Sequence, residues 1–332
     1  MSQELLSIDD ASARIATGAP LLLAGSEEAL RGLPAGQWVA GTIPYFMTDQ
    51  GGLRTHDKVF VTDVPSDATD ATIAVYDAES LPAVYRDLPD NGFGLMIVPA
   101  SSTCHLRFAI DAPAYEGFAM SPLAGWVSGV DLDDLGKITP KVFDGRTLTA
   151  HEDGVVVMQV SLPANKAADI GIVNLFSQGD GEALEFPEAG FSAGEATIDG
   201  ATHNLAEYID ANGWDTRWPL VADYYGAMIN VSFQDVDTDT GKVKLYAPVF
   251  PGMTYRHAKP VDDYVKDFTA ELAMGNAVAP VSFSCNCILN YVHSGLEGRK
   301  TEQFVGPVTF GEIAYQLLNQ TMVYVSIVDI GA

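Results

Sequence analysis

The chain has 332 residues, of which 47% are hydrophobic, which is enough apolar material for a packed interior and excludes a largely disordered protein. Its 18 basic and 44 acidic residues give a formal net charge of −26, and such a field disfavours binding to nucleic acid or to anionic membrane surfaces. The acidic residues are dispersed along the chain, which favours a solvated surface over an acidic binding patch.

The N-terminal segment, residues 1–19, predicts a short amphipathic helix, because its apolar residues recur near helical spacing around the start signal "IDDAS". The segment lacks the apolar core of a signal peptide, and no apolar run approaches the length of about 18 residues that a membrane-spanning helix needs. The cysteines Cys104, Cys285 and Cys287 are odd in number, which argues against a disulfide scaffold. We therefore expect a cytoplasmic protein.

Residues 20–176 predict an α/β domain in which apolar strands alternate with helices. We expect buried strands at "PLLLAG", "WVAGTIPYFM", "KVFVTDV", "ATIAVYD", "FGLMIVPAS", "LAGWVSGVDL", "GVVVMQVSL" and "ADIGIVNLF". We expect helices at "SEEALRGL", with Ser26 as its N-cap, and at "AESLPAVYRDL". The acidic stretch "DLDDLG" does not continue as an EF-hand loop, so it predicts a solvated turn rather than a calcium site.

Residues 177–200 are rich in Gly, Glu and Ala, which predicts a linker or an excursion between domains. Residues 201–332 predict a second α/β domain, with a helix at "THNLAEYIDANG", a hairpin around "DTDTG" and an amphipathic helix at "PVDDYVKDFTAELAMGN". The strand "APVSFSCNCILNY" then leads into a helix or turn. The expected fold class is α/β, with α+β left open, in two related halves with mixed sheets.

Three glycine-marked strands indicate an internal repeat of one α/β unit. They are "WVAGTIPYF", "LAGWVSGV" and "FVGPVTFGEI", with Gly41, Gly125 and Gly306 at comparable places, and each is followed by a buried strand. A glycine inside a strand weakens it unless the backbone bulges or closely approaches a neighbour, so these glycines predict structural kinks. We expect the kinked strands to border a shared cleft.

The C-terminal passages "SFSCNCILN" and "FVGPVTFGEIAYQLLNQTMVYVSI" resemble the C-terminal half of a FIST domain. Cys285, the triplet Gly311-Glu312-Ile313 and Asn319-Gln320-Thr321 match its motif, and "WVAGTIPYF" together with "PLAGWVSGVDLDDLGKITPKVFDG" resembles its N-terminal half. The resemblance implies a bacterial or archaeal intracellular sensory domain that binds a small molecule and takes part in signal transduction. Some FIST-like proteins have been regarded as haem-binding, so the resemblance leaves a haem open. Its axial ligand is any of the six histidines, His56, His105, His151, His203, His257 and His293.

Cys285-Asn286-Cys287 places two thiols on the same face of a strand. Two thiolates fall short of the four ligands of a structural zinc site, so no metal is expected here. The side chains fit small residues of the core, residues that line a pocket at the carboxyl end of a strand, or a cysteine nucleophile with His293 as its base.

Glu312 is expected to be half-buried, because it lies between apolar residues of a strand. An unpaired buried carboxylate is costly, so it needs a partner, and Arg299 and Lys300 are the nearest cations in the sequence. The carboxylate either clamps the kinked backbone or anchors a ligand. The expected ligand-binding residues are Cys285, Asn286, Cys287, Arg299, Gly311, Glu312 and Asn319.

Together these features predict a non-catalytic cytoplasmic protein that binds a small molecule and acts as a sensor, without binding nucleic acid or membranes. One alternative is a thiol-dependent hydrolase or transferase that uses Cys285 or Cys287. A second alternative is a structural partner in a signalling complex.

Overall fold

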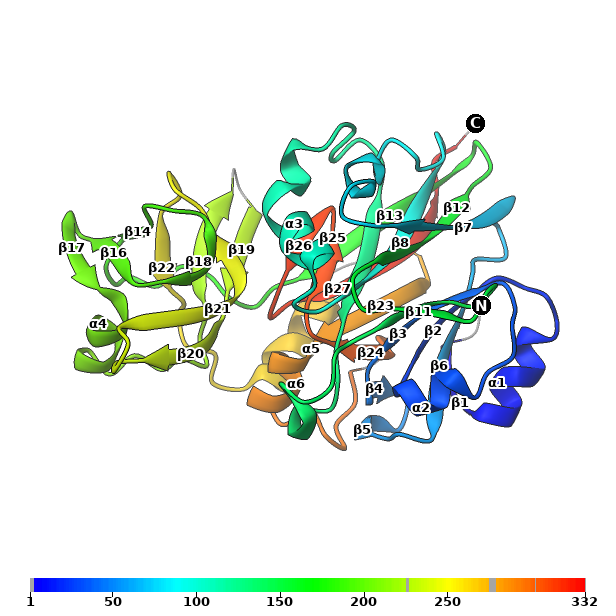
Figure 1. Ribbon diagram of the computed structural model, residues 1–332, viewed down its shortest axis with the longest axis horizontal. Helices are drawn as coiled ribbons and strands as arrows, with labels where there is room; N and C mark the ends of the chain where they lie inside the picture. Colours follow the sequence, from blue (N-terminus) through cyan, green and yellow to red (C-terminus); the bar gives the residue numbers. More distant parts are fainter. Residues whose placement is uncertain (1–2, 225–226, 275–278, 302, 332) are drawn as a thin grey trace.

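The computed structural model describes residues 3–224, 227–274, 279–301 and 303–331 (Figure 1). It consists of mixed β-sheets with helices on their outer faces, which confirms the predicted α/β class. Figure 1 shows a main body and, at its left, a separate lobe. None of the described helices is long and apolar enough to cross a membrane.

The main body repeats one structural unit three times, where the sequence had indicated two halves. Each unit has an edge strand, a strand–helix–strand segment, a β-hairpin and a returning strand. The first unit comprises β1 (Gln3–Ser7), β2 (Leu21–Gly25), α2 (Glu27–Arg31), β3 (Trp38–Thr42), β4 (Tyr45–Thr48), β5 (Gly51–Arg54) and β6 (Lys58–Asp63). The second comprises β7 (Asp70–Tyr76), β8 (Gly92–Pro99), α3 (Thr103–Asp111), β9 (Leu123–Ser128), β10 (Val142–Asp144), β11 (Thr149–His151) and β12 (Val155–Ser161). The third comprises β13 (Lys166–Val173), β23 (Val281–Cys287), α6 (Ile288–His293), β24 (Gly306–Thr309), β25 (Glu312–Ala314), β26 (Gln316–Leu318) and β27 (Met322–Asp329).

The strand order is the same in each unit. The two strands that flank the helix are parallel, and the returning strand pairs antiparallel with the first of them. The hairpin does not join its own sheet. The hairpin of the first unit joins the sheet of the third, that of the second joins the first, and that of the third joins the second. This cyclic exchange ties the units together.

The inner faces of the three sheets enclose one large hydrophobic core. Trp126 of β9, Phe46 of β4 and Phe283 of β23 are among its buried side chains. The strands β2, β8 and β23 are buried along almost their whole length, which explains their continuous apolar sequences. A second cluster lies outside the first sheet, and a third joins the outer face of the second sheet to the lobe.

Gly125 and Gly306 are required for the same physical reason. Each lies in the second strand of a parallel pair, and a Cβ atom there would lie 1.9 Å from a carbonyl oxygen of the first strand, that of Met96 or Ser284. Gly125 also has φ +150°, which favours glycine. The close approach of the two backbones therefore excludes a side chain at both positions.

Gly41 occupies the matching strand of the first unit for a different reason. A Cβ atom there would lie 2.5 Å from the indole ring of Trp126, so the glycine makes room for a core side chain. The three glycines thus have the same topological setting, as the repeat predicted. They lie in the packed interior and do not border an open cleft, so the expectation of a shared hollow at these residues is wrong.

The lobe is inserted between β13 and β23 of the third unit. The elements of the lobe are β14 (Leu184–Glu185), β15 (Gly190–Ala193), β16 (Glu195–Ile198), β17 (Ala201–Asn204), α4 (Leu205–Ala211), β18 (Leu220–Tyr224), β19 (Ala227–Val231), β20 (Phe233–Asp237), β21 (Lys242–Val249) and β22 (Tyr255–His257). The helix α5 (Tyr264–Met274) follows in the chain and packs on the main body beside α6, where Phe268 belongs to the large core (Figure 1). Residues 177–200 therefore contain strands of this inserted lobe and are not a linker between two domains.

Several local predictions differ from the structure. Residues 1–19 contain the strand β1 before the helix α1 (Ile8–Ile15), so the helix begins later than expected. The predicted helix "AESLPAVYRDL" is limited to the 3₁₀ helix Leu81–Ala83, because the proline removes a backbone donor. The run "WVAGTIPYFM" is divided into β3 and β4, which belong to different sheets. The sequence also gave no expectation of α3, which Ser102 caps.

Candidate functional site

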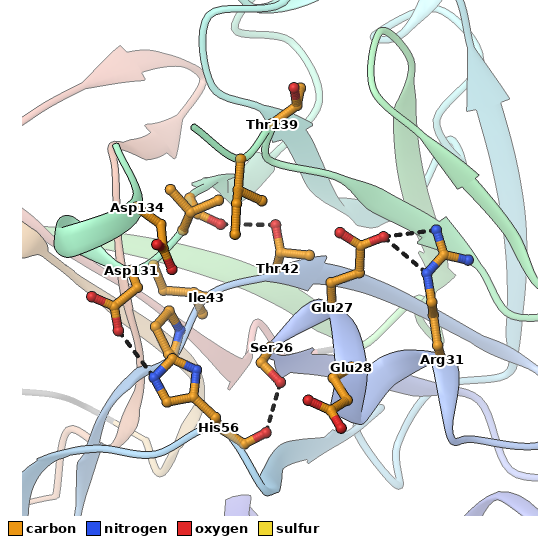
Figure 2. Close-up of a pocket in the computed structure, with 14 residues that line it drawn as sticks. Ser26, Glu27, Glu28, Arg31, Thr42, Ile43, His56, Asp131, Asp134 and Thr139 are labelled. Atoms are coloured by element: carbon orange, nitrogen blue, oxygen red, sulfur yellow. Dashed lines mark hydrogen bonds and ion pairs between the residues drawn. The ribbon is translucent and has the colours of Figure 1, made fainter. Parts of the chain in front are cut away.

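A cavity of ≈ 540 Å³ opens at the carboxyl ends of β2 and β3, between the first and second units (Figure 2). Its walls are residues of the β2–α2 turn, the segment after β3 and the loop after β9. They are Ser26, Glu27, Glu28, Arg31, Thr42, Ile43, Pro44, His56, Gly129, Val130, Asp131, Asp134, Ile138 and Thr139. We call it the first cavity. Ligands of open α/β sheets commonly bind at this edge.

The turn after β2 is fixed by Ser26, the N-cap of α2. Its Oγ accepts a hydrogen bond from the Ala29 amide at 3.1 Å and donates one to the His56 carbonyl oxygen at 2.7 Å. On the opposite wall, Thr42 Oγ1 donates to the Gly129 carbonyl oxygen at 2.8 Å. Figure 2 shows the bond between Ser26 and His56. Both hydroxyls therefore brace the walls through backbone oxygens.

Asp131 is the most deeply buried charged residue of this cavity, with a side chain that is 2% exposed. Its Oδ2 lies 2.6 Å from Arg54 and 3.0 Å from Nε2 of His56, and its Oδ1 accepts a hydrogen bond from the Tyr45 hydroxyl at 3.3 Å. A buried carboxylate is stable only with such partners. The cluster holds His56 against the cavity and joins the hairpin β4–β5 to the loop after β9.

Glu27 is also neutralised by neighbours. Burial by itself would raise the pKa of Glu27, but hydrogen bonds from Lys141 and Arg31, each at 2.7 to 2.9 Å, outweigh it and lower the pKa below its ordinary value. Glu28 and Asp134 line the same cavity and have no ion-pair partner within the part of the chain that the structure describes. The first cavity therefore carries uncompensated negative charge.

The arrangement does not form a nucleophile and base pair. The hydroxyl of Ser26 is directed at the backbone oxygen of His56, while the imidazole faces Asp131. A serine nucleophile needs the imidazole nitrogen within hydrogen-bond reach of its own hydroxyl. The described residues also contain no group of three or more His, Cys, Asp or Glu side chains arranged to hold a metal ion. The chemistry that these walls offer is electrostatic binding.

Glu312 is completely buried, more than the sequence indicated, and it lines neither the first cavity nor the hollow beside Asn286. Its Oε2 accepts hydrogen bonds from the Thr321 hydroxyl at 2.8 Å and the Thr321 amide at 3.2 Å, and its Oε1 lies 3.1 Å from the Thr309 hydroxyl. Burial raises the pKa of Glu312 to about 8. The side chain is a clamp between β24, β25 and the start of β27.

The expectation that Arg299 or Lys300 pairs with Glu312 is wrong. Arg299 lines a separate surface depression together with Asp263 and His293, and no ion pair of Glu312 occurs among the residues with described positions. Threonine hydroxyls and a backbone amide supply the hydrogen bonds instead. A neutral, protonated carboxyl group needs no counter-ion, which explains how the site exists without one.

The thiols of Cys285 and Cys287 are buried beside Glu312. Burial, and secondarily the negative charge of Glu312, raise the pKa of both thiols well above the ordinary value. Cys285 Sγ donates to the Gly125 carbonyl oxygen at 3.4 Å. These are small core side chains, which was one of the alternatives that the sequence left open. A thiolate nucleophile with His293 as base is not supported, because a high pKa keeps the thiol protonated.

The remaining predicted site residues form a packed junction. Asn286 is buried and accepts a hydrogen bond from Asn290, and the hollow beside Asn286 has an open volume of ≈ 0 Å³. Asn319 donates to the Asn230 carbonyl oxygen at 2.7 Å, which ties the third unit to the lobe. A Cβ atom at Gly311 would lie 3.0 Å from Val127, so this glycine permits close packing. These residues hold the fold together at this place and do not line an open site.

Sequence reasoning missed the residues that do line the first cavity. Asp131 belongs to "DLDDLG", which was interpreted as a solvated turn, and Arg54 and His56 lie more than seventy residues before it. The sequence feature that could have indicated the site is the position of Ser26 and Glu28 directly after the buried strand β2. That position marks the carboxyl edge of a parallel sheet.

A haem does not fit the histidines that line cavities. Nε2 of His56 is engaged by Asp131. His105, which lines another cavity, accepts a hydrogen bond from the Ser101 amide at Nδ1, so the proton of its neutral ring is on Nε2, where an iron ligand needs a free lone pair. His293 lies in a polar depression without an apolar slot for a porphyrin.

A family model described as a family of unknown function, DUF6976, matches residues 6–328. The match covers the three units and the inserted lobe, so it includes the first cavity and the Glu312 clamp. No curated protein matches the chain. The resemblance to FIST domains stays a prediction. Because the match extends over nearly the whole sequence, the chain belongs to the DUF6976 family.

Proposed function

We propose that the protein is a non-catalytic small-molecule-binding protein, and that the first cavity binds a small organic cation such as an amine or a guanidinium compound. The observation that carries this proposal is the acidic lining, in which Glu28 and Asp134 have no ion-pair partner among the described residues. A cationic group between them replaces the missing partners. The overall charge of −26 further favours the approach of cations over anions.

The walls of the first cavity also suit the body of such a ligand. Ile43, Val130 and Ile138 provide apolar surface beside the carboxylates. A volume of ≈ 540 Å³ lies in the range of small-molecule sites, which combine apolar walls with a few charged groups. The Asp131 cluster fixes one wall, because its ion pairs restrain the loop that carries Val130 and Asp134.

The place of the cavity supports a sensory role. Its walls come from the first unit and from the loop after β9 of the second unit, so a bound cation contacts two units at once. Binding at such a junction favours one relative position of the units, which is how a ligand shifts a conformational equilibrium. The resemblance to sensory FIST domains agrees with this role. The thiol-dependent alternative is disfavoured by the protonated, buried thiols.

The test is a thermal-shift screen followed by calorimetric titration with putrescine, agmatine and choline. We expect at least one of these cations to raise the melting temperature of the wild type. The double variant Glu28→Gln with Asp134→Asn should bind it about tenfold more weakly or worse, because two charge-assisted contacts are removed. Glu207→Gln, on the exposed side of α4 in the lobe, is the matched control and should bind as the wild type does.

Two results count against the proposal. One is that none of these cations shifts the melting temperature or produces heat at any tested concentration. The other is that the double variant binds with wild-type affinity, which would place the cations elsewhere on the acidic surface.

A further inference from the structure

A second cavity, of ≈ 700 Å³, lies between the second unit and the inserted lobe. Its floor is the turn from β8 into α3 together with the loop after β9. Its other wall is formed by residues of β15, β20 and β21. The residues that the argument uses are Ser101, His105, Phe191, Lys244, Tyr246 and Phe310. This β8–α3 turn of the second unit corresponds to the β2–α2 turn of the first unit, which lines the first cavity.

His105 has an unused hydrogen-bond donor at this cavity. The residue is only 7% exposed, and its Nδ1 accepts a hydrogen bond from the Ser101 amide at 3.2 Å. Burial lowers the pKa of His105 to about 4, so the ring is neutral at physiological pH and carries its proton on Nε2. Nε2 is buried and has no hydrogen-bond acceptor among the residues that the structure describes. An unsatisfied buried donor of this kind costs free energy until an acceptor reaches it.

The turn that positions this donor is itself constrained. Ser101 has φ 62°, a left-handed conformation that is uncommon for residues other than glycine. Ser102 caps α3, with its Oγ accepting from the His105 amide at 3.0 Å. The turn therefore holds the imidazole in one orientation, with Nδ1 against the backbone. Strained turns of this kind concentrate at ligand-binding sites.

The charges around the second cavity favour an anion. Lys137 and Lys244 line it, and Glu152 is its acidic lining residue. Glu152 lies 3.4 Å from Lys141, and Lys244 lies 3.5 Å from Asp235, so neither of these residues brings a full uncompensated charge. The N-terminal end of α3, which carries the positive end of the helix dipole, has no acidic residue in its first turn. One of its amides, that of Cys104, donates a hydrogen bond to Asp153.

The remaining walls are aromatic and apolar. The Phe191 ring of the lobe lies against the His105 ring in a tilted contact, with centroids 5.5 Å apart. Tyr246 and Phe310 add aromatic surface from the lobe and from the third unit. A ligand with a flat or apolar body finds contacts on each side, and it displaces the Phe191 ring to reach Nε2.

We infer that the second cavity binds a small carboxylate with an aromatic or apolar body, whose carboxylate accepts the Nε2–H of His105 while the body lies between the lobe and the second unit. The second cavity adjoins the first, because Val130, Ile138 and Thr139 line both, and the two take ligands of opposite charge. The bound carboxylate contacts both the inserted lobe and the main body.

The test is a titration of the full-length protein, labelled with ¹⁵N-histidine, with benzoate and hexanoate, and with benzyl alcohol as an uncharged comparison. We expect a saturable shift of the His105 Nε2 resonance with a carboxylate and a weaker response to the alcohol. His105→Phe keeps an aromatic ring beside Phe191 and should weaken carboxylate binding, measured by calorimetry, by about tenfold or more. Lys244→Met, at an exposed position, should weaken it severalfold without affecting folding.

Glu28→Gln in the first cavity is the matched control and should leave carboxylate binding unchanged, so the two proposals fail or succeed separately. Saturating benzoate and hexanoate that leave the His105 Nε2 resonance unmoved would overturn the inference. Wild-type carboxylate affinity in Lys244→Met together with His105→Phe would do the same. If His105→Phe does not fold, the resonance shift and Lys244→Met decide the question.

Discussion

Glu312→Gln should remove a specific pH dependence of stability. In the folded protein burial raises the pKa of Glu312 to about 8, against an ordinary value of 4.5. A raised folded-state pKa means that the folded protein binds this proton more tightly than the unfolded chain. The stabilisation is therefore fully present below pH 4.5 and is lost as the pH rises to about 8. Glutamine keeps the shape of the side chain and cannot ionise.

The magnitude follows from the width of this interval. Each pH unit between the two pKa values lowers the free energy of unfolding by about 1.4 kcal/mol, so the whole interval corresponds to about 5 kcal/mol. In the neutral form the carboxyl group donates to Thr309 Oγ1, whose own hydrogen is then directed at the Asn286 carbonyl oxygen 3.3 Å away, while the Thr321 hydroxyl and amide donate to the other carboxyl oxygen. The protonated state therefore has all its hydrogen bonds.

The assay is urea unfolding of the wild type and Glu312→Gln at about pH 5 and about pH 8.5. Relative to the variant, the wild type should lose about 4 kcal/mol of unfolding free energy between these conditions. Glu207→Gln, which removes an exposed carboxylate, controls for general charge effects and should keep the wild-type slope. If wild type and Glu312→Gln have parallel pH profiles, the carboxyl group is not a buried, protonated clamp and the reasoning fails.

Three further predictions concern other parts of the fold. Iodoacetamide should label Cys285 and Cys287 at neutral pH only after denaturation, because both thiols are buried with raised pKa values; mass spectrometry of the native and unfolded protein checks this. Asp131→Asn should lower the free energy of unfolding by about 2 kcal/mol in urea titration, because it removes the buried carboxylate from a cluster in which Arg54 and His56 keep access to solvent. An unchanged midpoint would contradict the cluster's structural role. Gly125→Ala should cost about 3 kcal/mol or more by the same assay, whereas Gly136→Ala, with φ +75° and open space around it, should cost about 1 kcal/mol; equal effects would refute the close backbone approach.

The repeated unit was visible in the sequence because its main signals are local. The buried strands β2, β8 and β23 are continuous apolar runs, and glycine recurs in the strand that follows each. What joins the units was not visible, because it depends on pairing between distant residues. Gly306 of β24 pairs with Met47 of β4, for example, and no local pattern marks such a partner. The two halves inferred from the sequence are therefore three units in the structure.

The candidate site escaped prediction for the same reason. The burial of Glu312 was anticipated from its apolar neighbours, but its partners are the hydroxyls of Thr309 and Thr321 rather than a cation. Sequence reasoning looks for opposite charge, whereas a fully buried carboxyl group is more easily kept neutral. Asp131 shows the opposite case. It lies in an acidic stretch that suggests a solvated turn, but it is buried and paired with Arg54 and His56 from another unit.

Each of the three units has an edge at the carboxyl ends of its two parallel strands. The three edges differ in how open they are and in the charges that line them. Thr42, Ser128 and Thr309 each end the second strand of a parallel pair, and all three are buried. In the first unit the edge opens into an acid-lined cavity. In the second it opens into a cavity with lysines and a histidine donor that has no acceptor among the described residues. In the third, Glu312 bonds directly to Thr309 and the neighbouring hollow is filled. The same edge therefore occurs three times, packed in the third unit and open in the other two, and we propose that these two open edges take ligands of opposite charge.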